Sequence, residues 1–175
     1  NLNRQILFSP QDVGLYKVDV AKEKLIVLNE SVSIHFWRKR WSTIDCINYF
    51  KDYDIIVDAT DNFASRYLIN DACVLLDKPL VFGAVSRFEG QLAVFNWGTK
   101  TKSVNYRDVF PAPPQSDEVL NCAEAGVLGV LPGIIGVLQA TEVIKLITGI
   151  GEPLVNKLLT YNALQQEFFT IQLKH

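Results

Sequence analysis

The fold class predicted for this chain follows from one stretch, Ile55-Ile56-Val57-Asp58-Ala59-Thr60-Asp61-Asn62. Its apolar first half predicts a strand that ends at Asp58, and Asn62 opens a patterned helix. Two carboxylates and a helix N-terminus should therefore meet at one strand tip, which is where open α/β sheets hold their ligands. Asp58 and Asp61 are candidates for contact with a nucleotide phosphate and its metal.

A second group of candidate residues lies at the start of the chain. The segment Asn1-Leu2-Asn3-Arg4-Gln5 precedes Lys17 by one short turn and the opening of a helix. Cations and carboxylates on neighbouring strand tips suit a nucleotide phosphate together with its metal.

Helix and strand signals alternate in the first half of the chain. Asp12 is expected to cap a helix that stops at Asn29 and turns one apolar side inward, made of Val18, Ala21, Leu25 and Leu28. The alternation of Val32, Ile34 and Phe36 predicts a strand over 31–36. A short helix over 43–51 and the strand 54–58 follow.

The second half continues the sheet. The helix that Asn62 opens should end before Asp77 and should pack through Ala64, Leu68, Ala72 and Leu75. Further expected elements are strands over 80–85 and 91–96, a long loop over 99–121, an apolar helix from about Gly126 to Gly149, and strands over 158–161 and 167–173. This order predicts an α/β fold of the Rossmann-like, doubly wound type, with a mostly parallel sheet continued by antiparallel strands.

A glycine-rich phosphate loop is missing from this pattern. Doubly wound nucleotide folds ordinarily open with an apolar strand and a G-x-G-x-x-G turn, and the sequence contains no such motif. We therefore expect residues 1–175 to be a single domain that is incomplete at its N-terminus, the C-terminal part of a longer protein.

Composition excludes several classes of protein. Seventeen Lys and Arg against nineteen Asp and Glu give a net charge of −2, so no nucleic-acid binding is expected from electrostatics. Three widely spaced cysteines argue against a disulfide framework and for a reducing, cytoplasmic compartment. The longest uncharged stretch, 125–141, is shorter than the ~20 residues of a membrane span and is expected to be a buried helix.

Five ordered motifs carry a family resemblance that covers essentially the whole chain. They are Asn1-Leu2-Asn3-Arg4-Gln5, the segment from Asp12-Val13-Gly14 to Lys17, Asp58-Ala59-Thr60-Asp61-Asn62, Arg87-Phe88-Glu89-Gly90-Gln91 and Cys122-Ala123-Glu124-Ala125-Gly126-Val127. Together they resemble the MoeB, ThiF and HesA adenylyltransferases, the prokaryotic relatives of ubiquitin-activating enzymes.

The resemblance implies an activity and a set of site residues. Family enzymes use ATP and Mg²⁺ to adenylate the C-terminal glycine carboxylate of a ubiquitin-like sulfur carrier protein, as in molybdopterin or thiamine biosynthesis, and they form homodimers. By this resemblance Arg4 and Lys17 contact the triphosphate, and Asp61 holds the metal. The remaining residues implied at the nucleotide are Asn1, Gln5, Asp58 and Asn62. A fragment without the phosphate loop is expected to be inactive alone.

Several of these residues have structural alternatives that the sequence leaves open. Arg4 and Lys17 could be ordinary surface charges. Asp58 and Asp61 could each serve the following helix as a cap or hydrogen-bond acceptor. Arg87 either lines a channel for the carrier tail or braces a tight strand connection. Cys122 aligns with a cysteine that becomes linked to the carrier in some relatives, or it is a buried cysteine without chemistry, as is expected of Cys46 and Cys73.

Two further expectations concern metal and assembly. Many relatives hold a structural zinc through two C-x-x-C pairs, whereas the stretch that matches the first pair is Asn105-Tyr106-Arg107-Asp108, so no zinc is expected. Gly129, Gly133 and Gly136 are spaced to let another backbone approach, either in a crowded core or at a subunit interface.

Two other functional classes stay open at this point. The chain could belong to a nucleotide-binding or dimerisation scaffold without catalysis. It could also belong to an NAD(P)-dependent Rossmann enzyme, although no acidic ribose-binding residue follows a glycine motif.

Overall fold

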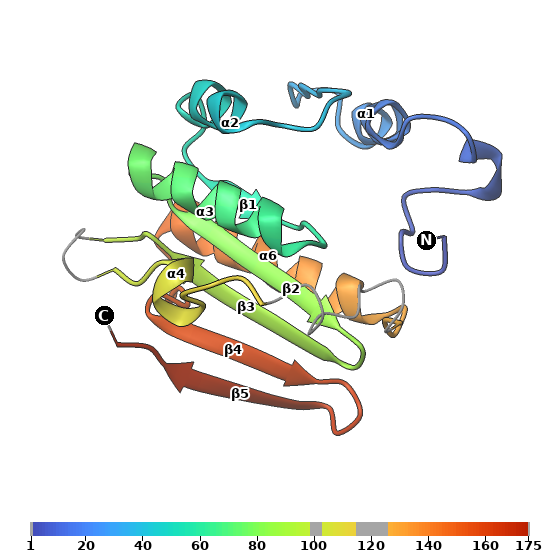
Figure 1. Cartoon of the computed structure of the whole chain (residues 1–175). Coiled ribbons are helices and arrows are strands. Elements are labelled where there is room, and N and C mark those ends of the chain that lie inside the picture. The colour runs from blue at the N-terminus through green and yellow to red at the C-terminus, as the bar shows by residue number, and fades with distance from the viewer. Residues whose placement is uncertain (1, 99–102, 115–125, 175) are drawn as a thin grey trace. The chain divides into compact units, whose positions relative to one another are not determined.

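The computed structural model describes residues 2–98, 103–114 and 126–174. The chain forms two compact units, Asn1–Trp41 and Ser42–His175. Figure 1 labels the α-helices and strands of both units.

The first unit contains a 3-10 turn, η1 (Pro10–Asp12), and the helix α1 (Lys17–Leu28). The helix stops at Asn29 as predicted, but the prediction that Asp12 caps it is wrong. Asp12 accepts hydrogen bonds from the Ser9 backbone N–H and hydroxyl at 2.6 and 2.8 Å, so it closes η1, and α1 begins five residues later. The Asp12 carboxylate also pairs with Lys24 Nζ at 2.6 Å, which helps to lower its pKa to about 2.

The strand predicted over 31–36 does not form. A strand exists only through hydrogen bonds to a neighbour, and no other strand lies within the described part of the first unit. Val20 is the one buried residue among those described in this unit. The predicted inward side of α1 is partly open, since Leu25 and Leu28 are exposed.

The second unit is built on one five-stranded sheet in the order β1-β2-β3-β4-β5. Its strands are β1 (Ile56–Asp58), β2 (Leu80–Ser86), β3 (Glu89–Phe95), β4 (Lys157–Asn162) and β5 (Glu167–Gln172). β1 and β2 pair in parallel, and the other three pairings are antiparallel. The predicted change from parallel to antiparallel pairing is confirmed, and the parallel part is the smaller one among the described strands.

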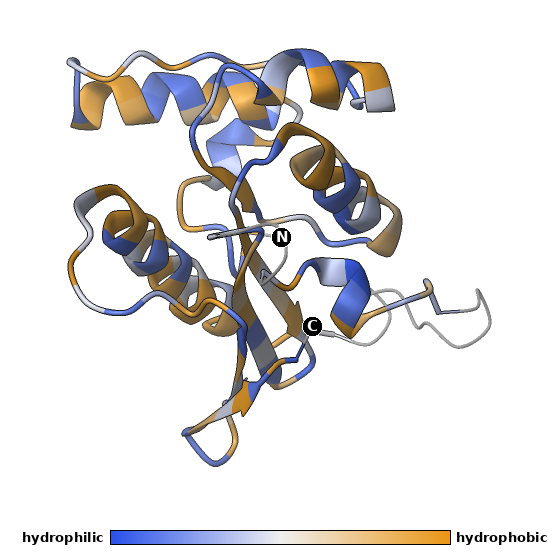
Figure 2. Ribbon diagram, turned by 90° about the vertical axis from the view of Figure 1, so that its left-hand side faces the viewer, coloured by the Kyte–Doolittle hydropathy of each residue, from blue (hydrophilic) through white to orange (hydrophobic). Residues whose placement is uncertain are grey.

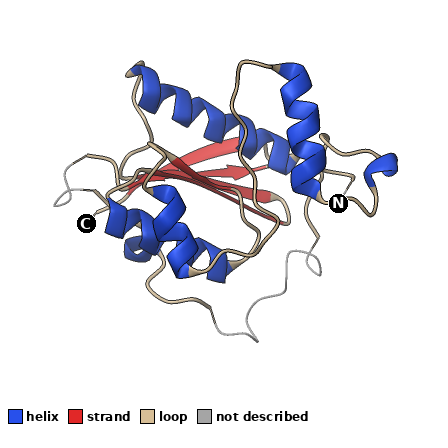
Figure 3. Ribbon diagram, turned by 90° about the horizontal axis from the view of Figure 1, so that it is seen from above, coloured by secondary structure: helices blue, strands red, loops and turns tan. Residues whose placement is uncertain are grey.

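Helices cover both faces of this sheet, as a doubly wound fold requires. α3 (Phe63–Leu76) and the short α4 (Tyr106–Val109) lie in front of the sheet, and α6 (Leu131–Thr148) lies behind it (Figure 1). α2 (Thr43–Phe50) packs on α3. Figures 2 and 3 show the strands between these two helical layers.

The inner strand β2 is buried on both faces over its first four residues and divides the core in two. Val81 faces α6, where it packs with Leu92, Val94 and Leu146. Phe82 faces α4, and its ring centroid lies 5.2 Å from that of Tyr106. Successive side chains of a strand point to opposite faces, and helices cover both faces of β2, so both sets of side chains must be apolar. This explains why residues 80–82 are consecutive apolar residues.

The proline-rich segment 99–121 is predicted to be an extended loop, but part of it forms the helix α4. Val104 and Tyr106 are each 1% exposed, and α4 begins at Tyr106. Tyr106 is the largest of the fully buried side chains. Val104 and Tyr106 therefore belong to the core, whereas residues 111–113 are exposed, as expected of a surface loop.

The buried side of α3 is not the predicted one. Ala64 and Leu75 are exposed, and of the predicted positions Ala72 alone is fully buried. The buried residues are Arg66, Tyr67, Asn70, Ala72 and Cys73. Three polar or partly polar side chains turn inward because they hydrogen-bond or stack against neighbouring segments, a role that apolar periodicity cannot detect.

α6 starts at Leu131, five residues later than predicted, and ends at Gly149 with φ +70° as predicted. By length and composition it could cross a membrane, but one stripe of it is buried against β2 and β3. The stripe consists of Leu131, Ile135, Gln139, Glu142 and Leu146. The opposite side is exposed, so the expectation of a buried helix holds for one stripe only.

Candidate functional site

Three of the predicted residues lie together where β1 ends and α3 begins. Asp58 is the last residue of β1, and Asn62 caps α3 by accepting a hydrogen bond from the Ser65 N–H at 2.9 Å. Asp61 directly precedes this cap and is exposed. Because Asn62 supplies the cap, the capping alternative for Asp61 is excluded, and its carboxylate faces solvent at the carboxyl end of a strand.

Asp58 differs from Asp61 in almost every respect. It is 1% exposed, and its Oδ1 accepts hydrogen bonds from the N–H and the hydroxyl of Thr60 at 2.8 and 2.7 Å. Burial raises the pKa of the Asp58 carboxyl, while the Thr60 bonds oppose this shift. Oδ1 closes the turn that carries Asp61, whereas Oδ2 is buried without a hydrogen-bond partner among the described residues, so contact of Asp58 with the metal or nucleotide stays a prediction beside its hydrogen-bonding role.

Arg66 lies beneath the same turn. Its Nη2 donates to the Thr60 carbonyl at 3.4 Å, and its guanidinium stands 5.2 Å from the Phe63 ring centroid. Arg66 is 8% exposed, and its charge acts against the burial effect on the pKa of Asp58. A buried cation beside a buried carboxylate limits the cost of placing either charge in the core.

The residues at this strand tip fit a magnesium ion. Mg²⁺ takes oxygen ligands and is usually held by one or two protein carboxylates, with phosphates and waters completing its shell. Asp61 offers such a carboxylate, exposed and not used as a cap. Among the described residues no cluster of three or more His, Cys, Asp or Glu side chains occurs, so a site built wholly from protein ligands is not present there.

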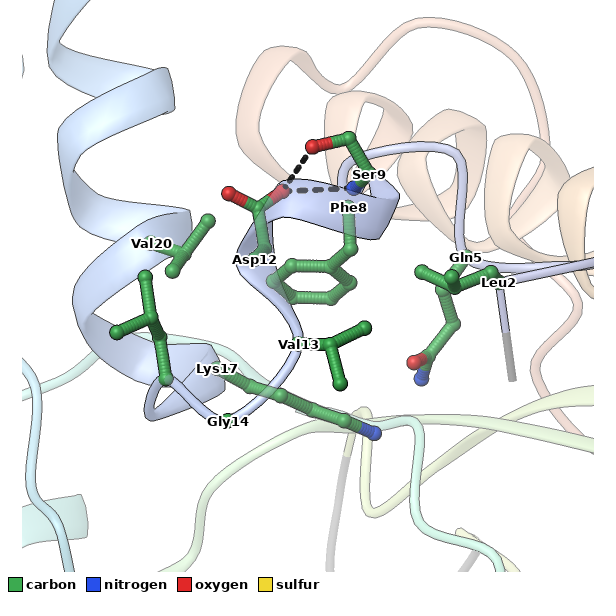
Figure 4. Close-up of a pocket in the computed structure, with 10 residues that line it drawn as sticks. Leu2, Gln5, Phe8, Ser9, Asp12, Val13, Gly14, Lys17 and Val20 are labelled. Carbon is green, nitrogen blue, oxygen red and sulfur yellow. Dashed lines mark hydrogen bonds between the residues drawn. The ribbon is translucent and has the colours of Figure 1, made fainter.

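The first unit holds a hollow of about 210 Å³ beside the start of α1. Lys17 and Gln5 are among its lining residues, together with Leu2, Phe8, Ser9, Asp12, Val13, Gly14, Leu15 and Val20. Figure 4 shows the polar ends of Lys17 and Gln5 extending away from the Ser9–Asp12 turn. The hollow is smaller than the roughly 300–1,000 Å³ of a typical ligand pocket, and its size suits a phosphate group rather than a whole nucleotide.

The start of α1 favours an anion. Lys17 is the first residue of the helix, and no side chain caps the helix N-terminus. Unpaired N–H groups and the helix dipole attract negative charge, and they make a lysine at this position unfavourable for the helix itself. The acidic Asp19 also lies in this first turn, and phosphate binding by Lys17 stays a prediction.

Arg4 is half-buried, and its Nη1 donates to the Asn3 side chain at 3.3 Å. Asn1 and Cys122 lie outside the described residues. The structure thus places the described site residues in two groups, one in each unit: Arg4, Gln5 and Lys17 in the first, and Asp58, Asp61 and Asn62 in the second.

Arg87 stands in the two-residue connection between β2 and β3, with φ +47°. Its carbonyl accepts a hydrogen bond from the Leu128 N–H at 2.9 Å, and the Phe88 carbonyl accepts one from the Ala163 N–H at 2.8 Å. The bracing of this connection is therefore done by main-chain atoms. The side chain of Arg87 is not needed for it.

Replacing Arg87 by glycine separates its two proposed roles. Arg87→Gly keeps the main-chain bonds and removes a left-handed strain of roughly 1–2 kcal/mol, so thermal unfolding of the full-length protein is expected to stay within about 1 kcal/mol of the wild type. Arg87→Ala, which keeps a Cβ in the strained conformation, is the matched control. A large loss of stability in the glycine variant alone would contradict this account of the turn.

The positions that match the first pair of zinc ligands form a helix cap instead. The Asn105 N–H donates to Asp108 Oδ2 at 2.8 Å, and Asn105 Oδ1 accepts from the Arg107 N–H at 2.9 Å, which closes the first turn of α4. Their oxygens are engaged in this cap, and neither residue is the soft ligand that a structural zinc site uses. The residues do not fit zinc, and its absence stays a prediction.

Side chains of α3 hold α4 in place. Arg107 forms two hydrogen bonds to Asp71, each of 2.7 Å, which lower the pKa of that carboxyl. Asn70 Oδ1 accepts the Tyr106 N–H at 2.9 Å. Asn70 was not among the predicted contacts, although a fully buried asparagine in a helix signals such a bond.

The two cysteines among the described residues of the second unit, Cys46 and Cys73, behave as predicted. Cys46 and Cys73 are free and buried, at 1% and 0% exposure. Burial raises the pKa of both thiols, so neither forms a thiolate readily.

Comparison with known proteins supplies relatives along the whole chain. The sequence matches the ThiF family over residues 1–175. It is 47% identical over 170 residues to a "Sulfur carrier protein adenylyltransferase" of Thermus thermophilus, covering 96% of this chain and 63% of the relative. It is 44% identical over 176 residues to the "Probable adenylyltransferase/sulfurtransferase MoeZ" of Mycobacterium tuberculosis, covering 99% of this chain and 45% of the relative. The chain thus spans less than two thirds of the length of these relatives.

Solved structures share the fold. A crystal structure of E. coli MccB with ATP superimposes with a TM-score of 0.82 at 20% identity, covering 99% of this chain and 52% of that one. A structure of PaaA gives a TM-score of 0.76 at 19% identity, covering 98% of this chain and 60% of that one. At these identities the likeness establishes the Rossmann-like α/β architecture.

Proposed function

Because the chain belongs to the ThiF family, we propose that the complete protein uses ATP to adenylate the C-terminal carboxylate of a small sulfur carrier protein. The observation that carries this proposal is that each unit presents one of the required charges: Asp61 is exposed and non-capping at a strand tip of the second unit, and Lys17 stands at an uncapped helix N-terminus of the first. A metal-binding acid and a phosphate-binding cation are the groups that this reaction needs. Relatives named as sulfur carrier and molybdopterin-synthase adenylyltransferases supply the substrate class.

The proposed chemistry forms one bond and breaks one. A carboxylate oxygen of the carrier tail attacks the α-phosphorus of ATP, the bond to the bridging oxygen breaks, and pyrophosphate leaves. No proton has to move, so positioning and charge neutralisation make up the catalysis. When bound, Mg²⁺ would neutralise phosphate oxygens.

The residues of this chain divide these tasks between them. Arg4 and Lys17 bind phosphate oxygens, and Gln5 lies beside Lys17 at the same hollow. Asp61 holds the metal. Asn62 orients the start of α3, and Asp58 shapes the turn before it. Asn1 and Cys122 keep the roles that the resemblance implies, nucleotide contact and linkage to the carrier.

ATP–pyrophosphate exchange tests the proposal. The full-length protein should return labelled pyrophosphate into ATP when a sulfur carrier with an intact C-terminal glycine is present, and it should fail to do so with a carrier that lacks this residue. A non-catalytic scaffold would show no exchange with any carrier. We expect the activity in the cytoplasm, without a membrane or nucleic-acid partner.

We further propose a homodimer that uses the outer side of α6. A Cβ added at Gly133 or Gly136 would meet no atom within 4 Å, which excludes a crowded core around these glycines among the described residues. The same side exposes Val137, Ile144 and Ile147, at 68%, 59% and 70%. Exposed apolar patches of this kind mark interaction sites.

Gly133→Leu tests the proposed dimer through two quantities, the stability of the subunit and its association. Leucine is favoured over glycine in a helix by close to 1 kcal/mol, so the folded subunit should not be weakened, while a bulky side chain between two close helices should drive the dimer apart. Sedimentation of the full-length protein should therefore show a shift toward monomer without a fall in melting temperature. An unchanged dimer would exclude this face as the interface.

A further inference from the structure

Gln139 is the polar member of a buried stripe on an otherwise apolar helix. It is 5% exposed and stands between Ile135 and Glu142 on the side of α6 that faces the sheet. A buried amide is costly unless its donors and acceptor are paired. Its retention in the core therefore requires a specific partner.

The partners of Gln139 are the main chains of two neighbouring strands. Its Nε2 donates to the Asp58 carbonyl at 2.7 Å and to the Val81 carbonyl at 3.3 Å. Asp58 lies in the last residue pair of the parallel ladder between β1 and β2. Gln139 thus binds the two strands at the point where their own pairing stops and the turn toward α3 begins.

Gly83 makes this arrangement possible. A Cβ built on Gly83 would lie 2.4 Å from Cδ of Gln139, and the three atoms nearest to it all belong to the Gln139 amide group. This distance is far below any real Cβ contact, so the glycine provides the space that the amide fills. Gly83 lies on β2 and Gln139 lies on α6, and the contact between them depends on both residues.

The turn between β1 and α3, next to the Gly83–Gln139 contact, carries Asp61. Asp58 offers its carbonyl to Gln139 and its Oδ1 to Thr60, and so it connects the helix behind the sheet to the turn in front. We propose that Gln139 is a positioning residue that holds this turn, and with it the Asp61 carboxylate, in the geometry for metal and nucleotide binding. This inference rests on the proposed function.

The first test replaces Gln139 by methionine, which keeps the length of the side chain and removes the donor. Displacement of a reacting group by about 1 Å can cost 10²-fold in rate, so pyrophosphate exchange by the full-length protein should fall by about tenfold to hundredfold. The Mg²⁺ concentration for half-maximal exchange should rise. Gln172→Met is the matched control, because Gln172 also donates to a main-chain carbonyl, that of Asn156, but on β5.

A second variant gives a readout that a merely structural role would not move. The neutral acid form of Gln139→Glu keeps one donor hydrogen for the Asp58 carbonyl, whereas the carboxylate has none and repels it. Buried carboxylic acids titrate above their usual range. Exchange by this variant should therefore approach the wild type at low pH and decline relative to it as the pH rises.

A double variant tests the link to Gly83. Gly83→Ala should expel the Gln139 amide and lower the rate as much as Gln139→Ala does. The combination of both should be no worse than Gly83→Ala alone, because the methyl group then enters space that the amide has left. Additive losses would show that the two residues act separately.

Amide hydrogen exchange separates this inference from the proposed function. The Thr60 and Ser65 N–H groups are held by side chains of the turn, and they should exchange about tenfold faster in Gln139→Met than in Gln172→Met. If the wild type adenylates no carrier, the proposed function fails, but the hydrogen-exchange measurement still tests whether Gln139 holds the turn. Unchanged exchange at both amides overturns the inference, as does a wild-type Mg²⁺ dependence in an active Gln139→Met protein.

Discussion

Asp61→Asn is expected to lower ATP–pyrophosphate exchange by the full-length protein by about three orders of magnitude, the upper end of the range for removing one charge-stabilising group from an active site. The amide keeps the size of the side chain but loses the negative charge that would hold a divalent cation. Asp61 is exposed and does not cap α3, since Asn62 does. Asparagine keeps an oxygen that can accept from Asn62 Nδ2, and a carboxylate near the start of a helix contributes about 0.3–1 kcal/mol, so the variant should fold with at most a small fall in melting temperature.

Asp77→Asn is the matched control for this variant. Asp77 ends the same helix, α3, in a left-handed conformation with φ +57°, which asparagine adopts readily. The chemical change is identical, but it lies at the other end of the helix. Exchange should stay at the wild-type level in this control. Equal losses in the two variants would indicate a general effect on α3 and would contradict a metal-binding role for Asp61.

Lys17→Ala should have the next largest effect, a loss of about 10²-fold in exchange. Most of the loss should appear as a higher KM for ATP, because the ammonium is proposed to bind phosphate. The same variant should be slightly more stable than the wild type, since it removes a cation from a helix N-terminus at a gain of about 0.3–1 kcal/mol. Lower activity with equal or higher stability is the pattern of a residue kept for function.

Two comparisons sharpen this experiment. Arg4→Ala should change the KM for ATP in the same direction. Lys22→Ala removes the same group from the same helix. Lys22 Nζ lies 5.0 Å from the Phe36 ring centroid, and Lys22 is not among the residues lining the hollow. The KM for ATP of the Lys22→Ala variant should therefore be unaltered. An unaltered KM in Lys17→Ala would make Lys17 a surface charge and remove it from the site.

Much of the second unit could be predicted from the sequence because its signals are local. The strands β2 to β5 appear within one or two residues of their expected bounds. The cap at Asn62 and the stop at Gly149 each depend on one residue type in one conformation. Such features need no knowledge of the tertiary structure.

The predictions that were wrong share a different cause. The strand expected over 31–36 had the right alternation, but pairing is a property of two segments, and the alternation of one segment does not reveal its partner. The inward side of α3 was misassigned because Arg66 and Asn70 are buried in place of apolar residues. Where polar contacts decide burial, hydrophobic periodicity selects the wrong side.

Gln139 shows how one such contact could have been found. It occupies a position in the stripe Leu131, Ile135, Gln139, Glu142 and Leu146, whose spacing of three or four residues predicts a single buried side. A polar residue in such a stripe requires a buried partner. The sequence therefore indicates that Gln139 has a role, although only the structure identifies the Asp58 carbonyl as its partner.

The most direct measurement of the central claim is the mass of the sulfur carrier after incubation with the full-length protein, ATP and Mg²⁺. We expect a carrier whose C-terminal glycine bears AMP, formed by the wild type and the Asp77→Asn control and absent with Asp61→Asn. A carrier that stays unmodified in the presence of well-folded wild-type protein, or one that is adenylated equally by Asp61→Asn, would contradict it.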